Sequence, residues 1–244
     1  MKIFRKVRQE LAAQNKISKY LRYAIGEIAL VVIGILIALQ INTWNEDRKD
    51  RIVERQILIG IKEALESDII NQIRPNLKDC SKDLQNIEKI MQSIDNKEAF
   101  NDSDATIYSS LMFSKDFKYE LTAYKALENE GIKVIRTPEL KKEILEIYNM
   151  NYPEVQEYIQ NFSNNLMAFF RPYMRSNFKF IYVDNHTASY IPIDYNIIIN
   201  DPLFRNNVMT AKVNFSNILS ALEKIEGKVN EVIEQIDKEI ENTL

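Results

Sequence analysis

The sequence predicts a mainly α-helical protein, with one transmembrane helix near the N-terminus and then an extracytoplasmic antiparallel helical bundle that carries a short irregular or β-like insertion. Three observations support this fold class. Residues 24–41 form one apolar run, two later segments repeat apolar residues in steps of three and four, and the chain has only five glycines in 244 residues. Such steps place side chains on one helix face, whereas turn-rich β folds and doubly wound folds need more glycine.

Residues 1–23 form a basic segment that we expect in the cytoplasm. Phe4, Val7 and Leu11 have helical spacing, with basic residues between them. This pattern fits a short amphipathic helix in the membrane interface, and it equally fits an unstructured basic tail. In both cases the cytoplasmic part is too short for an enzymatic or DNA-binding domain.

Residues 24–42 are predicted to cross the membrane. The run AIGEIALVVIGILIALQI, residues 24–41, contains only two strongly polar side chains, Glu27 and Gln40. At about 1.5 Å per residue it spans roughly 27 Å, close to the hydrocarbon thickness of a bilayer. A cleaved signal peptide is the alternative, but the end of the run offers no small-x-small cleavage pattern.

The charges that flank the span predict its orientation. Seven Lys and Arg residues precede it, whereas four follow it before residue 56. Because basic residues accumulate on the cytoplasmic side, the N-terminus should be cytoplasmic. Residues 43–244 would then form an extracytoplasmic, periplasmic domain on the bacterial cytoplasmic (inner) membrane, with the lipid bilayer as one partner.

Three positions inside the span are candidate functional residues. Glu27 is ionisable, although it lies only about one turn from the cytoplasmic boundary, where it can snorkel. Gly34 and Ala38 form a small-xxx-small pair that would let two spans approach closely. We therefore consider these residues as intramembrane polar or helix-packing positions.

The helix is expected to continue beyond the span to about residue 94. Its apolar residues first recur at four-residue steps and then, from Leu77 to Ile94, form a heptad seam that includes Cys80. Pro75 lies between these runs and predicts a kink or a short break. The polar stretch 95–104 should end the helix.

Shorter helices are predicted for the middle of the chain. Asp104 is a candidate cap for a helix through Phe113, and a helix over 121–129 would end at Gly131. Thr137 and Pro138 have the cap-plus-proline pattern of a helix start. Pro153 is expected to restart the helical pattern, which then continues to about residue 170 or beyond.

The insertion is predicted at residues 182–200, as an extended loop or a short strand pair across the bundle. Asp201 and Pro202 repeat the helix-start pattern, and the last helix carries the most regular heptad of the chain, Phe215 to Ile236. We expect this helix to return antiparallel to the first, within about one turn of the pairings Met91–Val208, Leu77–Leu222 and Leu65–Ile236. The competing interpretation is that both heptad seams pack between subunits and form a coiled-coil oligomer.

No catalytic, cofactor-binding or metal-binding residues are predicted, and we expect that the protein is not an enzyme. His186 is the only histidine, Cys80 is the only cysteine, and phosphate-binding loops and nucleophile elbows are missing from the sequence. The formal net charge of −3 offers no basic surface, so nucleic acid is not an expected partner.

The run YAIGEIALVVIGILIALQINTWNEDRK, with the preceding FRKVRQELAAQNKISKYLR, resembles the N-terminal signature of a family of uncharacterised bacterial envelope proteins that have one N-terminal span. The segments LTAYKALENEGIKVI and ELKKEILEIY resemble the external helical region of that family. The resemblance implies a single-pass membrane protein of unknown function and brings no catalytic residues.

Two classes of function remain. The first is an interaction or scaffold protein of the cell envelope, which binds another envelope protein or associates with itself. The second is a ligand-sensing bundle that signals through the span to a separate partner. The short cytoplasmic part favours the first.

Overall fold

The computed structural model describes residues 17–112, 114–182 and 188–242. It divides into two compact units, Met1–Glu54 and Arg55–Leu244. The amphipathic pattern predicted for the N-terminal segment lies outside the described residues, and so does His186.

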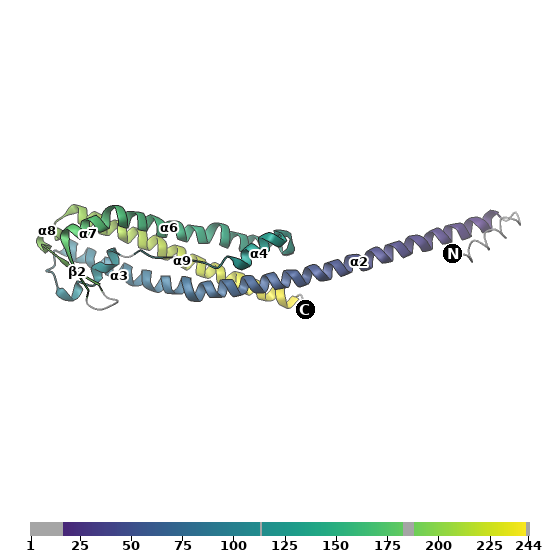
Figure 1. Ribbon diagram of the computed structural model, residues 1–244, viewed down its shortest axis with the longest axis horizontal. Helices are drawn as coiled ribbons and strands as arrows, with labels where there is room; N and C mark the ends of the chain where they lie inside the picture. The colour runs from purple at the N-terminus through teal and green to yellow at the C-terminus, as the bar shows by residue number, and fades with distance from the viewer. Residues whose placement is uncertain (1–16, 113, 183–187, 243–244) are drawn as a thin grey trace. The chain divides into compact units, whose positions relative to one another are not determined.

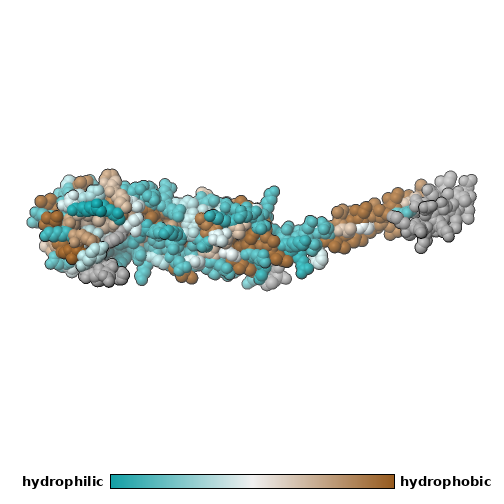
Figure 2. Space-filling model, viewed as in Figure 1, coloured by the Kyte–Doolittle hydropathy of each residue, from teal (hydrophilic) through white to brown (hydrophobic). Residues whose placement is uncertain are grey.

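One helix, α2 (Ile17–Asp68), supplies all described residues of the first unit. Its Leu, Ile and Val side chains between residues 25 and 41 are each 47–63% exposed, and Figure 2 shows them as a hydrophobic surface. This helix alone, among the described residues, is long and apolar enough to cross a membrane, a test that a signal sequence also passes. The predicted apolar helix is therefore present, and it is not buried by the described chain.

The second unit is mainly helical, as predicted. After the end of α2 it contains the π turn η1 (Ile69–Ile73), α3 (Arg74–Asn96), the 3-10 turns η2 (Asp102–Asp104) and η3 (Ile107–Leu111), α4 (Thr122–Glu130), the 3-10 turn η4 (Ile132–Val134), α5 (Pro138–Glu146), the π turn η5 (Ile147–Asn151), α6 (Tyr152–Asn165), the π turn η6 (Leu166–Phe170), α7 (Arg171–Asn177), β1 (Phe178–Tyr182), β2 (Ala188–Pro192), α8 (Tyr195–Ile199) and α9 (Pro202–Asn242). Helices α3, α6 and α9 lie side by side (Figure 1).

Three prolines lie inside long helices, and each follows a π turn. A proline ring clashes with the carbonyl four residues earlier and lacks an N–H. For Pro75, Pro153 and Pro172 that earlier residue is the middle one of η1, η5 and η6. The residue before each proline instead donates its N–H five residues back. The predicted kink or break at Pro75 is thus a π turn. Helix α6 begins beside Pro153 as predicted, and the π turn η5 joins it to α5 without an interruption.

Helix α9 runs antiparallel to α3 in the register predicted from the two seams. Three ion pairs define it: Lys212 to Glu88 at 3.1 Å, Arg74 to Glu226 at 2.8 Å and Lys62 to Asp237 at 2.5 Å. In each pair the residue numbers sum to 299 or 300, and the predicted pairings sum to 299 or 301, so the observed register lies within the predicted helical turn. The α9 seam from Phe215 to Ile236 is fully buried. The prediction that these two helices pack together within one chain is therefore confirmed.

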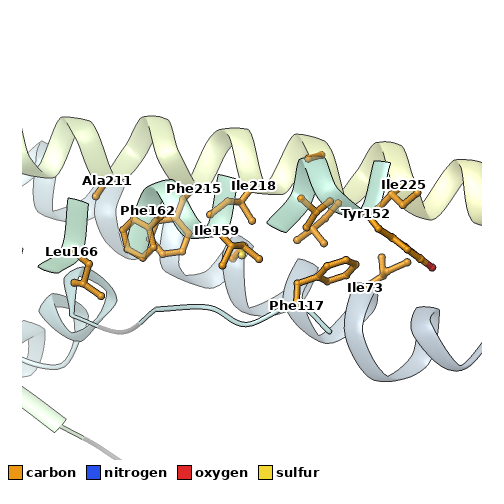
Figure 3. Close-up of a cluster of buried hydrophobic side chains, with 14 of the residues drawn as sticks. Ile73, Phe117, Tyr152, Ile159, Phe162, Leu166, Ala211, Phe215, Ile218 and Ile225 are labelled. Carbon is orange, nitrogen blue, oxygen red and sulfur yellow. The ribbon is translucent and has the colours of Figure 1, made fainter. Parts of the chain in front are cut away.

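The core of the second unit continues through α6. Tyr152, Phe162 and Phe215 are among the largest fully buried side chains. Figure 3 shows Phe162 from α6 beside Phe215 from α9, with ring centroids 4.7 Å apart. Cys80 is buried as predicted, and burial raises the pKa of its thiol to about 12. These residues give the second unit a hydrophobic core of its own.

The connection between α3 and α5 differs in part from its prediction. Helix α4 ends at Gly131, which has φ +93°, so the predicted helix and its stop are confirmed. The expected α-helix from Asp104 to Phe113 was wrong, because the described residues form two 3-10 turns, and the side chain of Asn101 rather than Asp104 accepts the capping N–H. Asp104 instead pairs with Lys89.

The starts of α5 and α9 agree with their predictions, and the predicted insertion agrees in part. Helix α5 begins at Pro138 as predicted, but the Thr137 hydroxyl donates to Glu239 at 2.8 Å instead of capping. Asp201 Oδ1 accepts the N–H of Leu203 at 2.8 Å and so caps α9. The predicted strand pair is present as the antiparallel pair β1–β2. Strand β1 begins at Phe178, before the predicted start at residue 182, so only β2 falls fully inside the predicted insertion. Its Ile197–Ile199 cluster, expected to be irregular, is helical, because Asp194 caps α8.

Candidate functional site

The predicted span residues Glu27, Gly34 and Ala38 all lie on α2 and share one face. At about 100° per residue, steps of seven and four residues keep them within roughly 40° of one another. A Cβ added at Gly34 would meet no atom within 4 Å. The face is therefore open along its small residues, which leaves it accessible to lipid or to another helix.

A second candidate lies in the bundle, where sequence reasoning had not placed one. Asp68, the last residue of α2, is only 3% exposed. Its Oδ1 accepts the backbone N–H of Glu120 at 2.9 Å, and its Oδ2 accepts the hydroxyl of Tyr152 at 2.9 Å. The carboxyl group thus joins α2, the connection before α4, and α6.

Burial controls the acidity of this carboxyl group. Desolvation raises the pKa of Asp68 to about 6, although the hydrogen bonds from Glu120 and Tyr152 oppose the rise. Loss of hydration penalises the charged form, whereas donors favour it. Asp68 therefore changes charge close to neutral pH.

Four tyrosines surround Asp68. Tyr119 lies 4.4 Å from Tyr152 between ring centroids, Tyr124 stacks on Tyr148 at 4.4 Å, and Tyr148 meets Tyr152 edge-on at 5.5 Å. Burial raises the pKa of Tyr148 and Tyr152 well above the ordinary value, so both hydroxyls stay protonated. The Tyr148 hydroxyl has no hydrogen-bond partner among the described residues. Tyr148 and Tyr152 thus place two neutral hydroxyl groups next to one titratable acid.

Asp68 is also the first of three rungs that hold residues 114–121, which we call the strap. The strap is neither helix nor strand, and Phe117 projects from it into the core (Figure 3). Gln72 Oε1 accepts the Lys118 N–H at 3.0 Å, and Asn76 Nδ2 donates to the Asp116 carbonyl at 3.0 Å. Buried or half-buried backbone groups need such partners.

The rungs follow from matching repeats. Successive rungs are four residues apart on the helical side, which includes the π turn η1, and two apart on the strap. Four residues of an ideal α-helix would advance about 6.0 Å, close to the advance of about 6.6 Å for two residues of an extended chain. On the other side of the strap, Gln156 of α6 donates to the Phe117 carbonyl at 3.1 Å. The side chains of α2, η1, α3 and α6 thus replace the hydrogen bonds that a neighbouring strand would supply.

The sequence contains a weak signal for this site. Asp68, Gln72 and Asn76 have helical spacing beside the apolar stripe, and Tyr148 and Tyr152 are one turn apart. Nothing in the sequence says that an extended segment lies against those polar residues. In the described part of the chain, His, Cys, Asp and Glu side chains form no group of three that could hold a metal.

Comparison with known proteins gives one match. The model of DUF6090, a family of unknown function, matches residues 27–154, a range that includes most of the apolar helix, Asp68, the strap and Tyr152. No curated protein and no solved structure matches the chain.

Proposed function

The chain belongs to the DUF6090 family, and we propose that it is a single-pass membrane-anchored interaction or scaffold protein of the bacterial cell envelope. In this proposal residues 24–42 cross the inner membrane, residues 1–23 are cytoplasmic, and the bundle is periplasmic. The role is non-catalytic.

The exposed apolar surface of α2 is the observation that carries the anchor. None of the most apolar 18-residue window is buried inside the molecule. Eleven Leu, Ile and Val residues lie between residues 24 and 41. At about −0.3 to −0.6 kcal/mol each, they favour insertion by roughly 3 to 7 kcal/mol, and the cost of Glu27 near the boundary is smaller than that of a central charge.

The bundle has a hydrophobic core of its own, separate from the apolar helix, and this supports a role as an anchored interaction domain. The buried core residues run from Leu58 to Ile236 and all belong to the second unit. Outside the apolar helix, many of the large exposed apolar side chains lie in the last third of the chain, between Met167 and Val213. Exposed apolar groups that gather on a folded domain commonly mark interaction sites.

Membrane fractionation tests the anchor. We expect the full chain to resist extraction from membranes by alkaline carbonate, and to keep its N-terminal residues by mass spectrometry. Replacing Val32 and Ile35 with Arg should move it to the soluble fraction, since two charges at mid-span outweigh the apolar gain. The matched control is Ile52→Arg, at an exposed position outside the span. Release of the unaltered chain by carbonate, or loss of its N-terminus, would contradict the anchor.

The topology has its own test. An enzyme that is active only after export, fused after Leu244, should be active in cells. A well-expressed but inactive fusion would place the bundle in the cytoplasm and overturn the proposed orientation.

The alternative role is ligand sensing, and an open groove favours it. The groove has a volume of about 610 Å³ and lies between the strap and α6, where Phe117, Gln156 and Ile159 are among its lining residues. A pull-down from gently solubilised membranes separates the two roles. A stoichiometric protein partner supports the scaffold, and its absence supports sensing.

A further inference from the structure

The outer edge of β1 presents backbone groups that the hairpin does not use. Phe180 lies opposite Tyr190, and the Tyr190 N–H donates away from the hairpin, to the Ala105 carbonyl at 2.9 Å. In an antiparallel pair, opposite residues point their N–H and C=O groups either both toward each other or both away. The N–H and C=O of Phe180 therefore point outward from β1. The pair Phe178–Pro192, two residues away, has the same orientation as Phe180–Tyr190. Pro192 fits there because it has no N–H and the hairpin needs none from it at that position.

This edge is accessible and apolar. Residues 179–182 are four consecutive exposed positions, with Phe180 48%, Ile181 44% and Tyr182 71% exposed. Phe180 and Tyr182 meet edge-on, with ring centroids 4.7 Å apart. Because strand side chains alternate, the aromatic pair lies on one face of β1 and Ile181 lies on the other. An exposed apolar edge of this kind is a template for another extended chain.

Basic residues precede and begin β1, and the first acidic residue after them in the sequence is Asp184. No Asp or Glu occurs from residue 158 to residue 183, whereas Arg171, Arg175 and Lys179 fall within that range. Arg175 and Lys179 form no ion pair with any described residue. Arg205, in contrast, pairs with Asp95 at 3.0 Å. Arg175, in the last turn of α7, and Lys179, on β1 itself, are therefore two cations available to an acidic partner at this edge.

We propose that β1 binds an extended segment of a partner protein, with acidic residues alternating with apolar ones, as an added antiparallel strand. This proposal rests on the interaction role proposed above and identifies its partner chemistry. The residue opposite Phe180 would exchange both backbone hydrogen bonds with it, while Lys179 and Arg175 attract the acidic side chains.

The charges and the backbone groups of β1 favour an acidic strand over a second copy of the chain and over an anionic bilayer. A second copy would bring its own Lys179 and Arg175 to the same edge, and like charges opposite each other destabilise a strand pair. An anionic bilayer would satisfy the charges, but it offers no ordered donors and acceptors for the backbone groups of Phe180. A strand with acidic side chains satisfies both requirements.

Binding to defined peptides tests the proposal on the full chain in detergent micelles. The probe is a labelled peptide of alternating Glu and Val, followed by fluorescence anisotropy. We expect saturable binding, at least tenfold weaker for a peptide of alternating Lys and Val. A Glu-Val peptide that carries N-methyl groups on alternate residues, and so cannot pair, should also lose at least tenfold.

Two variants of the chain locate the binding. Phe180→Pro removes the outward N–H together with the Phe180 ring, which contacts Tyr182 and Tyr190, and Lys179→Glu reverses the local charge, so each should weaken binding at least tenfold. Lys125→Glu makes the same charge change at an exposed position on α4 and should leave binding unchanged. Circular dichroism of each variant checks the fold, and Lys179→Glu keeps the test valid if Phe180→Pro unfolds the hairpin.

Four outcomes would overturn the proposal. They are no binding of the Glu-Val peptide, equal binding of its N-methylated form, self-association that Phe180→Pro abolishes, and capture of the chain by phosphatidylglycerol vesicles without peptide binding. Because the peptide assay is done in detergent, its failure leaves the membrane anchor untouched. Failure of the carbonate extraction test would leave the peptide result untouched in turn.

Discussion

Asp68→Asn should make the bundle less sensitive to pH. The pKa of Asp68 is about 6 in the folded chain and near the ordinary 3.8 when unfolded. The folded state therefore holds the proton more tightly. This group's contribution to stability is fully present below pH 3.8 and is lost as the pH rises through about 6.

The size of the effect follows from the same two pKa values. At about 1.4 kcal/mol per pH unit, the difference between 3.8 and about 6 limits the effect to about 3 kcal/mol. We expect about 2 kcal/mol, because residual access of water screens the charge. The amide introduced by Asp68→Asn would keep the side-chain size and one oxygen for the Glu120 N–H, but it does not titrate.

Urea unfolding of residues 55–244 between pH 4 and pH 7.5 measures this effect. The stability of the unaltered bundle should fall by about 2 kcal/mol relative to Asp68→Asn across that range. Asp79→Asn, an exposed substitution on α3, is the matched control and should run parallel to the unaltered bundle. If the Asp68→Asn curve also runs parallel to it, desolvation of this carboxyl group does not have the assigned effect.

Three other single substitutions and one cysteine pair test the packing and the backbone. Leu222→Asp places an unpaired charge in the α3–α9 seam and should cost more than about 4 kcal/mol or unfold the bundle, as circular dichroism would show. Gly131→Ala should destabilise the bundle by about 1 kcal/mol, because φ at this position is +93°. Gly227→Ala lies inside α9 with open space at its Cβ and should stabilise the bundle by up to about 1 kcal/mol; urea unfolding measures both. Cysteines replacing Lys62 and Asp237, in a chain without its native cysteine, should crosslink within one molecule; crosslinks only between molecules would restore the coiled-coil oligomer.

The sequence predicted the helices that bury a regular stripe of apolar residues. It did not predict the contacts of polar side chains outside that stripe. The α3–α9 register could be predicted because a heptad seam has one buried face and the chain direction limits the pairing. The helix start at Pro153 could be predicted from the proline, whereas the continuous connection to α5 could not, since a π turn lets a proline follow a helix without ending it. The Asp68 site was missed because its partners are backbone groups of a segment that has no periodic pattern of its own.

The apolar span illustrates a different limit. The sequence identified Glu27, Gly34 and Ala38 as candidate positions inside the span, and all three lie on α2. Their role depends on what surrounds the helix, and neither the order of residues nor the packing of one chain contains that information. The anchor and its topology therefore stay predictions until the extraction and fusion tests are done.

The three rungs under the strap combine two different repeats. Four residues of α-helix advance about 6.0 Å and two residues of an extended chain advance about 6.6 Å, so a straight α-helix would add about 0.6 Å of misalignment per interval, or about 1.2 Å over three rungs. The π turn η1 lies between the first and the third rung, so the helical side is not a straight α-helix here. The next position in the same series is Cys80, which is buried and brings no amide or carboxyl group to a further backbone partner. The polar series on the helical side therefore ends at Asn76, and with it ends the length of extended chain that these side chains can hold.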